Sequence, residues 1–245
     1  MHAIQTSGSC IRAITTDAFA GVARDEITDP RPWCEILRQW STFHPEFAYL
    51  PRKFKIAVSA SEADRAVTKL HDIGLQIVKN DKGETGFRVL VGGGMGRTPI
   101  LGEVVRAFLP WQHLLTYCDA ILRVYNRYGR RDNLYKARIK ILVKALGVEE
   151  FARQVDAEWE HAKDGPATLT QAEVDRVAAH FTPPAYKAEL PIDLGFEQHK
   201  ALNKAFATWV KRNVRAHRVD GYASVTLSLK ATGRAPGGLL PLQVR

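Results

Sequence analysis

Two lysines separated by one residue are the first candidate for chemistry in this chain of 245 residues. Lys53 and Lys55 flank Phe54 in residues 53–58, whose composition predicts a strand entered from Pro51. Because side chains alternate along a strand, both ammonium groups lie on one face, where each lowers the pKa of the other. Such a pair can hold an anion and give it a proton. The alternative is an exposed edge strand whose lysines prevent pairing with another chain.

A run of three glycines, residues 92–94, follows a second predicted strand at residues 86–91. Glycine lets backbone N–H groups approach an anion closely, and Arg97 adds a positive charge beside the run. The spacing does not fit a dinucleotide-binding fingerprint, because Arg97 takes the place of its third glycine, and no phosphate-loop Gly-Lys-Ser/Thr follows. The other interpretation is a tight turn from strand to helix.

Positive charge is concentrated in residues 120–144, which hold eight Lys and Arg residues and a single acidic residue, Asp132. Since the whole chain has a net charge of +9, this segment carries most of the excess. A spacing of four residues places Lys136, Lys140 and Lys144 on one stripe of a predicted helix at 134–146. The segment suits an anionic partner: a polycarboxylate cofactor, a phosphorylated ligand or, because aromatic residues alternate with arginines, nucleic acid. The alternative is a solvated basic surface.

Hydrogen-bonding side chains fill residues 5–12, which include Thr6, Ser7 and Arg12. They could hold carboxylates, although a capped loop explains the same composition. A nucleophilic role for Cys10 lacks a neighbouring base in the sequence. The three cysteines and eight histidines of the chain do not show the spacing of a metal site, so we expect no metal ligands among them.

The elements that must position these residues are helices and hairpin-connected strands. Strands are predicted at residues 53–58, 75–78, 86–91 and 222–229, and a turn at 81–84 joins the second strand to the third. Helices are predicted at residues 32–40, 61–70, 100–108, 114–125, 134–146, 148–161, 170–181 and 196–217. Because a regular strand–helix–strand rhythm is missing, we expect the α+β class, with a mixed sheet and helices.

Length and composition fit one or two globular domains, since 45% of the residues are hydrophobic and 25% charged. Asp164-Gly165-Pro166 is the clearest linker, and we expect a domain at 1–165, a helical linker at 166–195 and a second domain at 196–245. No apolar run reaches the roughly 20 residues that cross a bilayer. The N-terminus shows no secretory signal, so we expect a cytoplasmic protein with no membrane partner.

Taken in order, these segments resemble one family, the siroheme-dependent sulfite and nitrite reductases. The resemblance covers about residues 4–237, and the Leu-Pro-Arg-Lys-Phe-Lys string at 50–55 is its most specific part. The other matching segments are residues 5–8 with Arg12, 91–94, 127–133, 136–140 and 222–237. The resemblance implies a siroheme and iron–sulfur reductase domain over 1–165 and part of a ferredoxin-like half-domain over 196–245.

The family reduces sulfite to sulfide, or nitrite to ammonia, by six electrons at a siroheme coupled to a [4Fe–4S] cluster. The resemblance implies that Arg12, Lys53 and Lys55 hold the substrate anion and supply protons. It also implies that the siroheme carboxylates, which need cationic partners when buried, are held by a larger set: Thr6, Ser7, Arg12, Lys53, Lys55, Gly93, Gly94, Arg97, Arg138 and Lys140. Ferredoxin or an NADPH-dependent flavoprotein is the implied electron donor.

The chain departs from the family pattern in its cysteines. The family carries its cluster ligands as C-x5-C and C-x3-C pairs, and Cys10, Cys34 and Cys118 form neither. We therefore expect the central portion of an assimilatory sulfite reductase, incomplete as given and inactive in isolation. A nitrite reductase and an inactive fragment are the alternatives within the family. A basic nucleic-acid-binding module is the alternative from another class.

Overall fold

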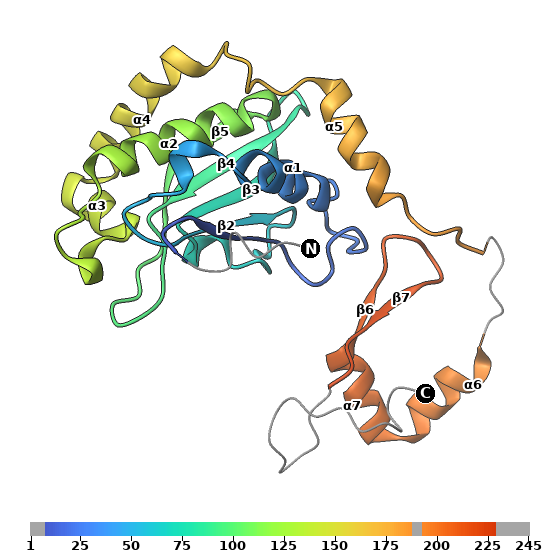
Figure 1. The fold of residues 1–245 in the computed structure, drawn as a ribbon. Coiled ribbons are helices and arrows are strands. Elements are labelled where there is room, and N and C mark those ends of the chain that lie inside the picture. The colour runs from blue at the N-terminus through green and yellow to red at the C-terminus, as the bar shows by residue number, and fades with distance from the viewer. Residues whose placement is uncertain (1–7, 188–192, 229–245) are drawn as a thin grey trace. The chain divides into compact units, whose positions relative to one another are not determined.

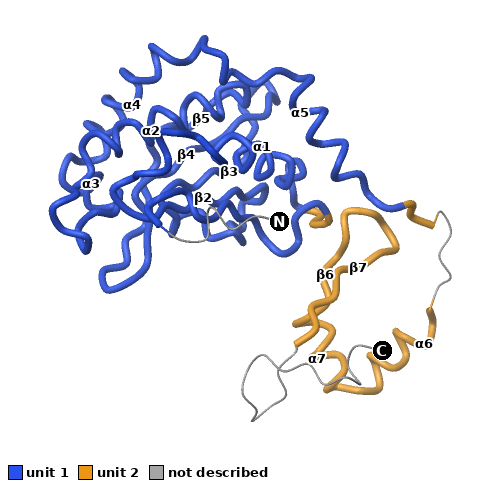
Figure 2. The backbone as a smooth tube through the Cα atoms, in the orientation of Figure 1, with its two compact units in different colours: residues 1–21, 25–184 blue, residues 22–24, 185–245 orange. Residues whose placement is uncertain are grey.

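The structure is a computed structural model that describes residues 8–187 and 193–228. The chain forms two compact units, residues 1–21 with 25–184 and residues 22–24 with 185–245 (Figures 1 and 2). The mixed sheet and helices confirm the α+β class. The domain boundaries and the ferredoxin-like character of residues 196–245 stay predictions.

A five-stranded mixed sheet forms the centre of the larger unit, in the spatial order β1-β2-β3-β4-β5. Its strands are β1 (Ile11–Thr15), β2 (Phe54–Ser59), β3 (Ile73–Lys79), β4 (Thr85–Val91) and β5 (Glu103–Pro110). The first three strands run parallel, whereas β3–β4 and β4–β5 are antiparallel pairs. The hairpin predicted from residues 75–91 is therefore confirmed as β3–β4.

Helices α1 (Arg31–Ser41) and α2 (Leu114–Tyr128) cover one face of this sheet (Figure 1). The ring of Phe54 in β2 lies 5.5 Å from that of Tyr125 in α2, and Phe87 in β4 lies 5.3 Å from Trp33 in α1. These rings belong to one hydrophobic core. Because strand side chains alternate, the neighbours of Phe54 in sequence point away from this core.

Three further helices complete the larger unit: α3 (Ile139–Leu146), α4 (Val148–Ala162) and α5 (Gln171–Ala178). Gly147 ends α3 with a positive φ of 82°, as its position after the helix predicts. The hydroxyl of Thr170 accepts the N–H of Glu173 at 3.3 Å, which confirms the predicted N-cap of the helix after residue 170.

The helix predicted at 100–108 is wrong, because these residues enter strand β5. Val104 pairs with Leu90 and Leu109 with Phe87 along β4. A short apolar run rich in β-branched residues fits either a helix or a strand, and here the neighbouring strand decides.

The helix predicted at 61–70 is also wrong, since only the 3-10 turn Thr68–Leu70 forms there. Asp64 and Val67 adopt positive φ angles of 44° and 55°, which a right-handed helix cannot contain. The Asp64 carboxylate accepts the N–H of Thr68 at 2.9 Å and its hydroxyl at 2.7 Å, so a local polar side chain competes with the helix.

Two other predicted elements are shorter than expected. The helix predicted at 134–146 is interrupted at Arg138, whose ψ of 147° separates the 3-10 turn Leu134–Lys136 from α3. The strand predicted at 222–229 is confined to β7 (Ala223–Val225), which pairs with β6 (Val214–Ala216), and residue 229 lies outside the described residues.

The smaller unit holds α6 (Leu194–Leu202), α7 (Lys204–Asn213) and the β6–β7 pair. Asp193 and Asn203 cap the two helices by accepting the N–H groups of Phe196 and Phe206, each at 3.0 Å. Residues 22–24 belong to this unit, where Ala23 forms a bridge with His217. Among the described residues, no helix is both long and apolar enough to span a bilayer.

Candidate functional site

Arg12, Lys53 and Lys55 come together because β1 and β2 are adjacent strands. Ile11 pairs with Phe54 and Ala13 with Lys55, and the register shifts at Arg12 between them. Ile11 and Phe54 point into the core, so the residues beside them emerge on the opposite side. The guanidinium Nε of Arg12 donates a hydrogen bond of 2.8 Å to the carbonyl oxygen of Gly8.

The charges around Lys53 lower the pKa of its ammonium group. Partial burial contributes most, and the positive charges of Arg12, Lys55, Arg138 and Arg52 follow. Nearby cations favour the neutral amine, and the effect of Lys55 on Lys53 agrees with the sequence prediction. Within residues 8–187 and 193–228, no carboxylate forms an ion pair with Arg12, Lys53 or Lys55. The cluster therefore offers unpaired positive charge to an anion.

Arg138 is close to the same cluster but already has a partner. Its Nε and Nη2 atoms lie 3.0 and 2.6 Å from Oδ1 of Asp72, a fully buried carboxylate that follows the 3-10 turn at residues 68–70. The other carboxylate oxygen, Oδ2, accepts the backbone N–H of Lys55 at 2.9 Å. Burial raises the pKa of Asp72, and the guanidinium of Arg138 opposes that rise.

The glycine run lies beside these residues at the end of β4. A Cβ on Gly93 would stand 2.4 Å from the carbonyl oxygen of Lys69 and 2.5 Å from that of His71, so no side chain fits. A Cβ on Gly94 would stand 3.1 Å from the Lys140 side chain and 3.6 Å from that of Arg138. Gly94 and Ile100 exchange two backbone hydrogen bonds of 2.9 Å, which close the loop between them. The turn after β4 thus approaches Arg138 and Lys140.

The remaining predicted site residues have different surroundings. The ammonium of Lys140 is buried against the loop and donates to the carbonyl oxygens of Met95 and Thr98. Arg97 is exposed and makes no ion pair within the described ranges. Thr6 and Ser7 lie outside the described residues.

The basic segment does not form the stripe predicted for Lys136, Lys140 and Lys144. Lys136 lies before α3 and Lys140 is buried, so the three ammonium groups do not share one exposed surface. Carboxylates pair with several arginines of the segment: Arg123 with Glu46, Asp119 and Glu158, Arg127 with Glu158, and Arg130 with Asp132. Much of the charge counted from the sequence is thus neutralised locally, which weighs against a nucleic-acid-binding surface.

The cysteines lie apart and are poorly placed for redox or metal chemistry. Cys118 is buried in α2 and Cys34 is nearly so in α1, and burial raises the pKa of each thiol to about 12. Burial also raises the pKa of Cys10, despite the positive charge of Arg12. In the part of the chain that the structure describes, no group of three His, Cys, Asp or Glu side chains could hold a metal ion.

Asp72 is the residue of this site that the sequence analysis missed. An isolated Asp before an apolar strand carries no recognisable signal, because its partners are 17 and 66 residues away.

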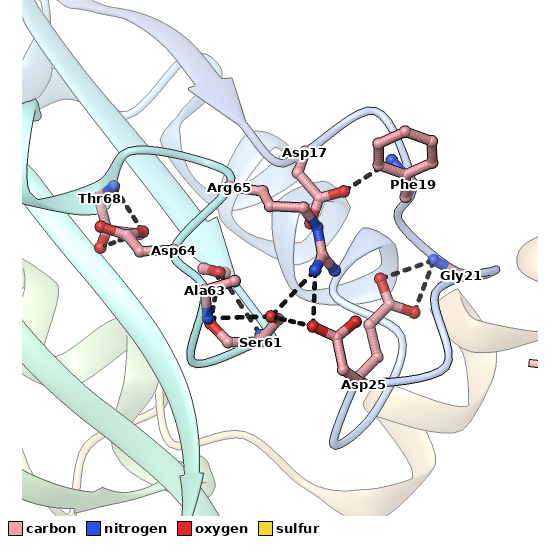
Figure 3. Close-up of polar contacts among 11 residues, drawn as sticks. Asp17, Phe19, Gly21, Asp25, Ser61, Ala63, Asp64, Arg65 and Thr68 are labelled. Atoms are coloured by element: carbon pink, nitrogen blue, oxygen red, sulfur yellow. Dashed lines mark hydrogen bonds and ion pairs between the residues drawn. The ribbon is translucent and has the colours of Figure 1, made fainter. Parts of the chain in front are cut away.

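A second polar cluster joins the loop after β1 to the loop after β2 (Figure 3). In it, Arg65 contacts Asp25 at 2.6 Å and Asp17 at 3.5 Å.

Fold and site together define an α+β domain with unpaired cations and a glycine turn at one end of a mixed sheet. Residues 7–163 match the family described as "Nitrite and sulphite reductase 4Fe-4S domain". The chain belongs to the nitrite and sulphite reductase family, which confirms the resemblance seen in the sequence.

Similar proteins include both sulfite and nitrite reductases. "Sulfite reductase [ferredoxin] 1" of Mycolicibacterium paratuberculosis is 32% identical over 169 residues, which cover 68% of this chain and 30% of that protein. The chloroplastic ferredoxin–nitrite reductase of Arabidopsis thaliana is 29% identical over 66% of this chain and 28% of its own. The structure of Mycobacterium tuberculosis NirA matches with a TM-score of 0.58 and 30% identity, over 64% of this chain and 28% of that one. The chain thus spans about a third of these relatives.

Proposed function

We propose that this chain is the siroheme-binding portion of an assimilatory sulfite reductase, which reduces sulfite to sulfide by six electrons. The observation that carries the proposal is the group of three cations, Arg12, Lys53 and Lys55, without carboxylate partners in the described residues. Like charges at close range raise the free energy of the protein unless an anion separates them. Siroheme carboxylates and a small oxyanion both supply such charge.

The residues present fit siroheme. The glycine turn brings its backbone close to Arg138 and Lys140, whose side chains a Cβ on Gly94 would meet, and the unpaired cations lie near Arg138. Arg12, Lys53, Lys55, Gly93, Gly94 and Arg97 would hold the cofactor, together with Thr6 and Ser7. When bound, siroheme supplies the iron that receives the oxyanion and the electrons.

The lysines carry the proton chemistry in this proposal. A lowered pKa makes the Lys53 ammonium a stronger acid than an ordinary lysine, so it gives up a proton more readily to an oxygen that leaves as water. In the same proposal the guanidinium of Arg12 holds the anion. In an enzyme completed with the cluster ligands, Lys53→Met should therefore reduce turnover by more than it reduces the siroheme content.

A [4Fe–4S] cluster does not fit the residues of this chain alone. Such a cluster takes four thiolates, and the chain has three cysteines, of which Cys118 is buried in α2 and Cys34 is half-buried in α1. In the proposed enzyme the ligands come from protein beyond these 245 residues, so the isolated chain is inactive as a reductase. The donor is ferredoxin or an NADPH-dependent flavoprotein, because the names of the relatives include both ferredoxin and NADPH.

Titration of the full chain with siroheme tests the proposal. We expect the chain to take up siroheme, as measured by the absorbance of the bound cofactor. Arg12→Met and Lys53→Met should each bind siroheme about tenfold more weakly or worse, since each removes a cation from the cluster. The matched control is Lys82→Met, which removes a lysine from the distant β3–β4 turn. Absence of uptake, or an equal loss in Lys82→Met, contradicts the proposal.

The choice of substrate is tested on the loaded chain. We expect sulfite to change the siroheme spectrum at a lower concentration than nitrite does. The reverse order would assign the chain to the nitrite reductases, the alternative within this family.

A further inference from the structure

Asp72 connects the three segments that carry the predicted site residues. Its carboxylate accepts the N–H of Lys55 in β2 and the guanidinium of Arg138 before α3. Its carbonyl oxygen accepts the N–H of Gly92, the first glycine of the run, at 3.1 Å. Asp72 itself lies immediately before β3, which is next to β2 in the sheet. One residue therefore sets the relation between the lysine strand, the glycine turn and Arg138.

A carboxylate in this position is costly to bury. Asp72 is 0% exposed, and an ionised group there must recover its lost hydration from nearby donors. The Asp72 carboxylate accepts three hydrogen bonds, two from the Arg138 guanidinium and one from the backbone N–H of Lys55. Buried ion pairs contribute little net stability on average, but they hold neighbouring groups in one arrangement. The position of Asp72 therefore indicates an orienting role more than a stabilising one.

We propose that Asp72 is a positioning residue of the anion site: it orients the backbone of Lys53 to Lys55 against Arg138 and neutralises that guanidinium. The inference rests on the proposed function, because it names the residue that prepares the same site. One consequence concerns charge. With Arg138 paired, the cations left for a ligand are those of Arg12, Lys53 and Lys55, and Arg138 acts mainly through its place beside Gly94.

The pKa of Lys140 depends on the ion pair between Asp72 and Arg138, although Lys140 is not part of that pair. The Asp72 carboxylate raises the pKa of Lys140, whereas burial and the Arg138 guanidinium lower it. Arg138 also lowers the pKa of Lys53. Asp72 and Arg138 thus shift the pKa of Lys140 in opposite directions. Removing one charge or the other should therefore shift this pKa with opposite signs, whereas a general loosening of the fold would shift it with the same sign in both variants.

The first experiment measures amide hydrogen exchange of the full chain. In Asp72→Ala we expect the Lys55 amide to exchange about tenfold faster or more, relative to the amides of α4, because its acceptor is gone. The matched control is Asp119→Asn, which removes another largely buried carboxylate paired with an arginine, in α2. If Lys55 changes only in step with α4, or equally in the control, the proposal is overturned.

The second experiment uses a gentler change, in case Asp72→Ala does not fold. Asp72→Asn keeps the size of the side chain and an acceptor for Lys55 but removes the charge. Lysine titration by NMR should then show a lower pKa for Lys140 in Asp72→Asn. In Arg138→Met the pKa values of Lys140 and Lys53 should both be higher. In the double variant the two opposite shifts in the pKa of Lys140 should cancel in part. Shifts of the same sign in both single variants would overturn the proposal, because a loosened structure produces them without any charge effect.

Siroheme titration separates this inference from the proposed function. If the wild-type chain takes up no siroheme, the proposed function fails, while the exchange and titration results still decide the role of Asp72 in orienting the cluster. If the wild type takes up siroheme and Asp72→Asn does so with the same affinity, the positioning role toward the ligand is overturned. We expect Asp72→Asn to bind siroheme at least about fivefold more weakly, and Asp119→Asn to bind it as the wild type does.

Discussion

The ammonium of Lys140 in α3 donates a hydrogen bond of 2.5 Å to the carbonyl oxygen of Thr98, across 42 residues of sequence. A second bond of 3.2 Å reaches the carbonyl oxygen of Met95. Lys140 therefore closes the loop that follows the glycine run, in addition to any contact with a ligand. The two hydrogen bonds commit part of the donor capacity of Lys140 to the protein, and burial lowers the pKa of its ammonium group.

Lys140→Met should lower the free energy of unfolding by about 1–3 kcal/mol, because two carbonyl oxygens of the loop lose a charged hydrogen-bond donor. Urea denaturation of the full chain measures this change. Lys144→Met is the control, since that lysine is exposed on the same helix. Equal midpoints for both variants would show that the two bonds contribute nothing.

Gly93→Ala should destabilise the chain by about 2 kcal/mol or more, or prevent folding. Its Cβ would meet two backbone carbonyl oxygens at 2.4 and 2.5 Å, and backbone atoms cannot move aside cheaply. Gly94→Ala is the matched comparison, because its Cβ would meet the flexible Lys140 side chain at 3.1 Å. Thermal unfolding should rank Gly93→Ala well below Gly94→Ala, and the opposite order would contradict the packing described here.

Glu26 should make stability depend on pH below neutrality. Burial raises its pKa from 4.5 to about 7, although both carboxylate oxygens accept the N–H of Gly21. Since the folded state binds the proton more tightly than the unfolded chain, the free energy of unfolding should fall as pH rises from about 4.5 to about 7, then level off. The negative charges of Asp17 and Asp29 raise the pKa of Glu26 further, and the positive charge of Arg65 opposes them.

The measurement is urea denaturation of wild type and Glu26→Gln at pH 5, 6, 7 and 8. The difference in stability between the two proteins should change with pH in that window. Glu150→Gln is the control, because Glu150 is exposed and hydrogen bonds to Arg153 and Gln154 lower its pKa to about 2. A constant difference between wild type and Glu26→Gln would mean that Glu26 has an ordinary pKa.

Tyr125→Phe should cost about 1 kcal/mol of stability or somewhat more. The buried Tyr125 hydroxyl donates a hydrogen bond of 2.8 Å to the carbonyl oxygen of Ala137, and its loss leaves that oxygen without this donor. Because Ala137 precedes Arg138, the variant also tests how α2 fixes the approach to α3. Tyr135→Phe, at a residue that is 90% exposed, should leave stability unchanged in the same denaturation assay.

Local patterns in the sequence predicted much of the fold around the site. Short-range rules predict the β3–β4 hairpin and the capped helix after Thr170. They also predict that Lys53, which is half-buried, and Lys55, which is exposed, flank a buried Phe54. The predictions for residues 61–70 and 100–108 failed where a side-chain cap or a neighbouring strand overruled periodicity.

The sequence by itself determined the family, through the order of its motifs, and the group of residues with which an anion would be held. Tertiary structure decided which of those cations are available. Arg138 and Lys140 are committed to Asp72 and to the loop carbonyls, and the arginines of α2 to nearby carboxylates. The physical reason is that charge neutralisation depends on distance in space, and residues such as Asp72 and Arg138 meet only when the strands and α3 have packed.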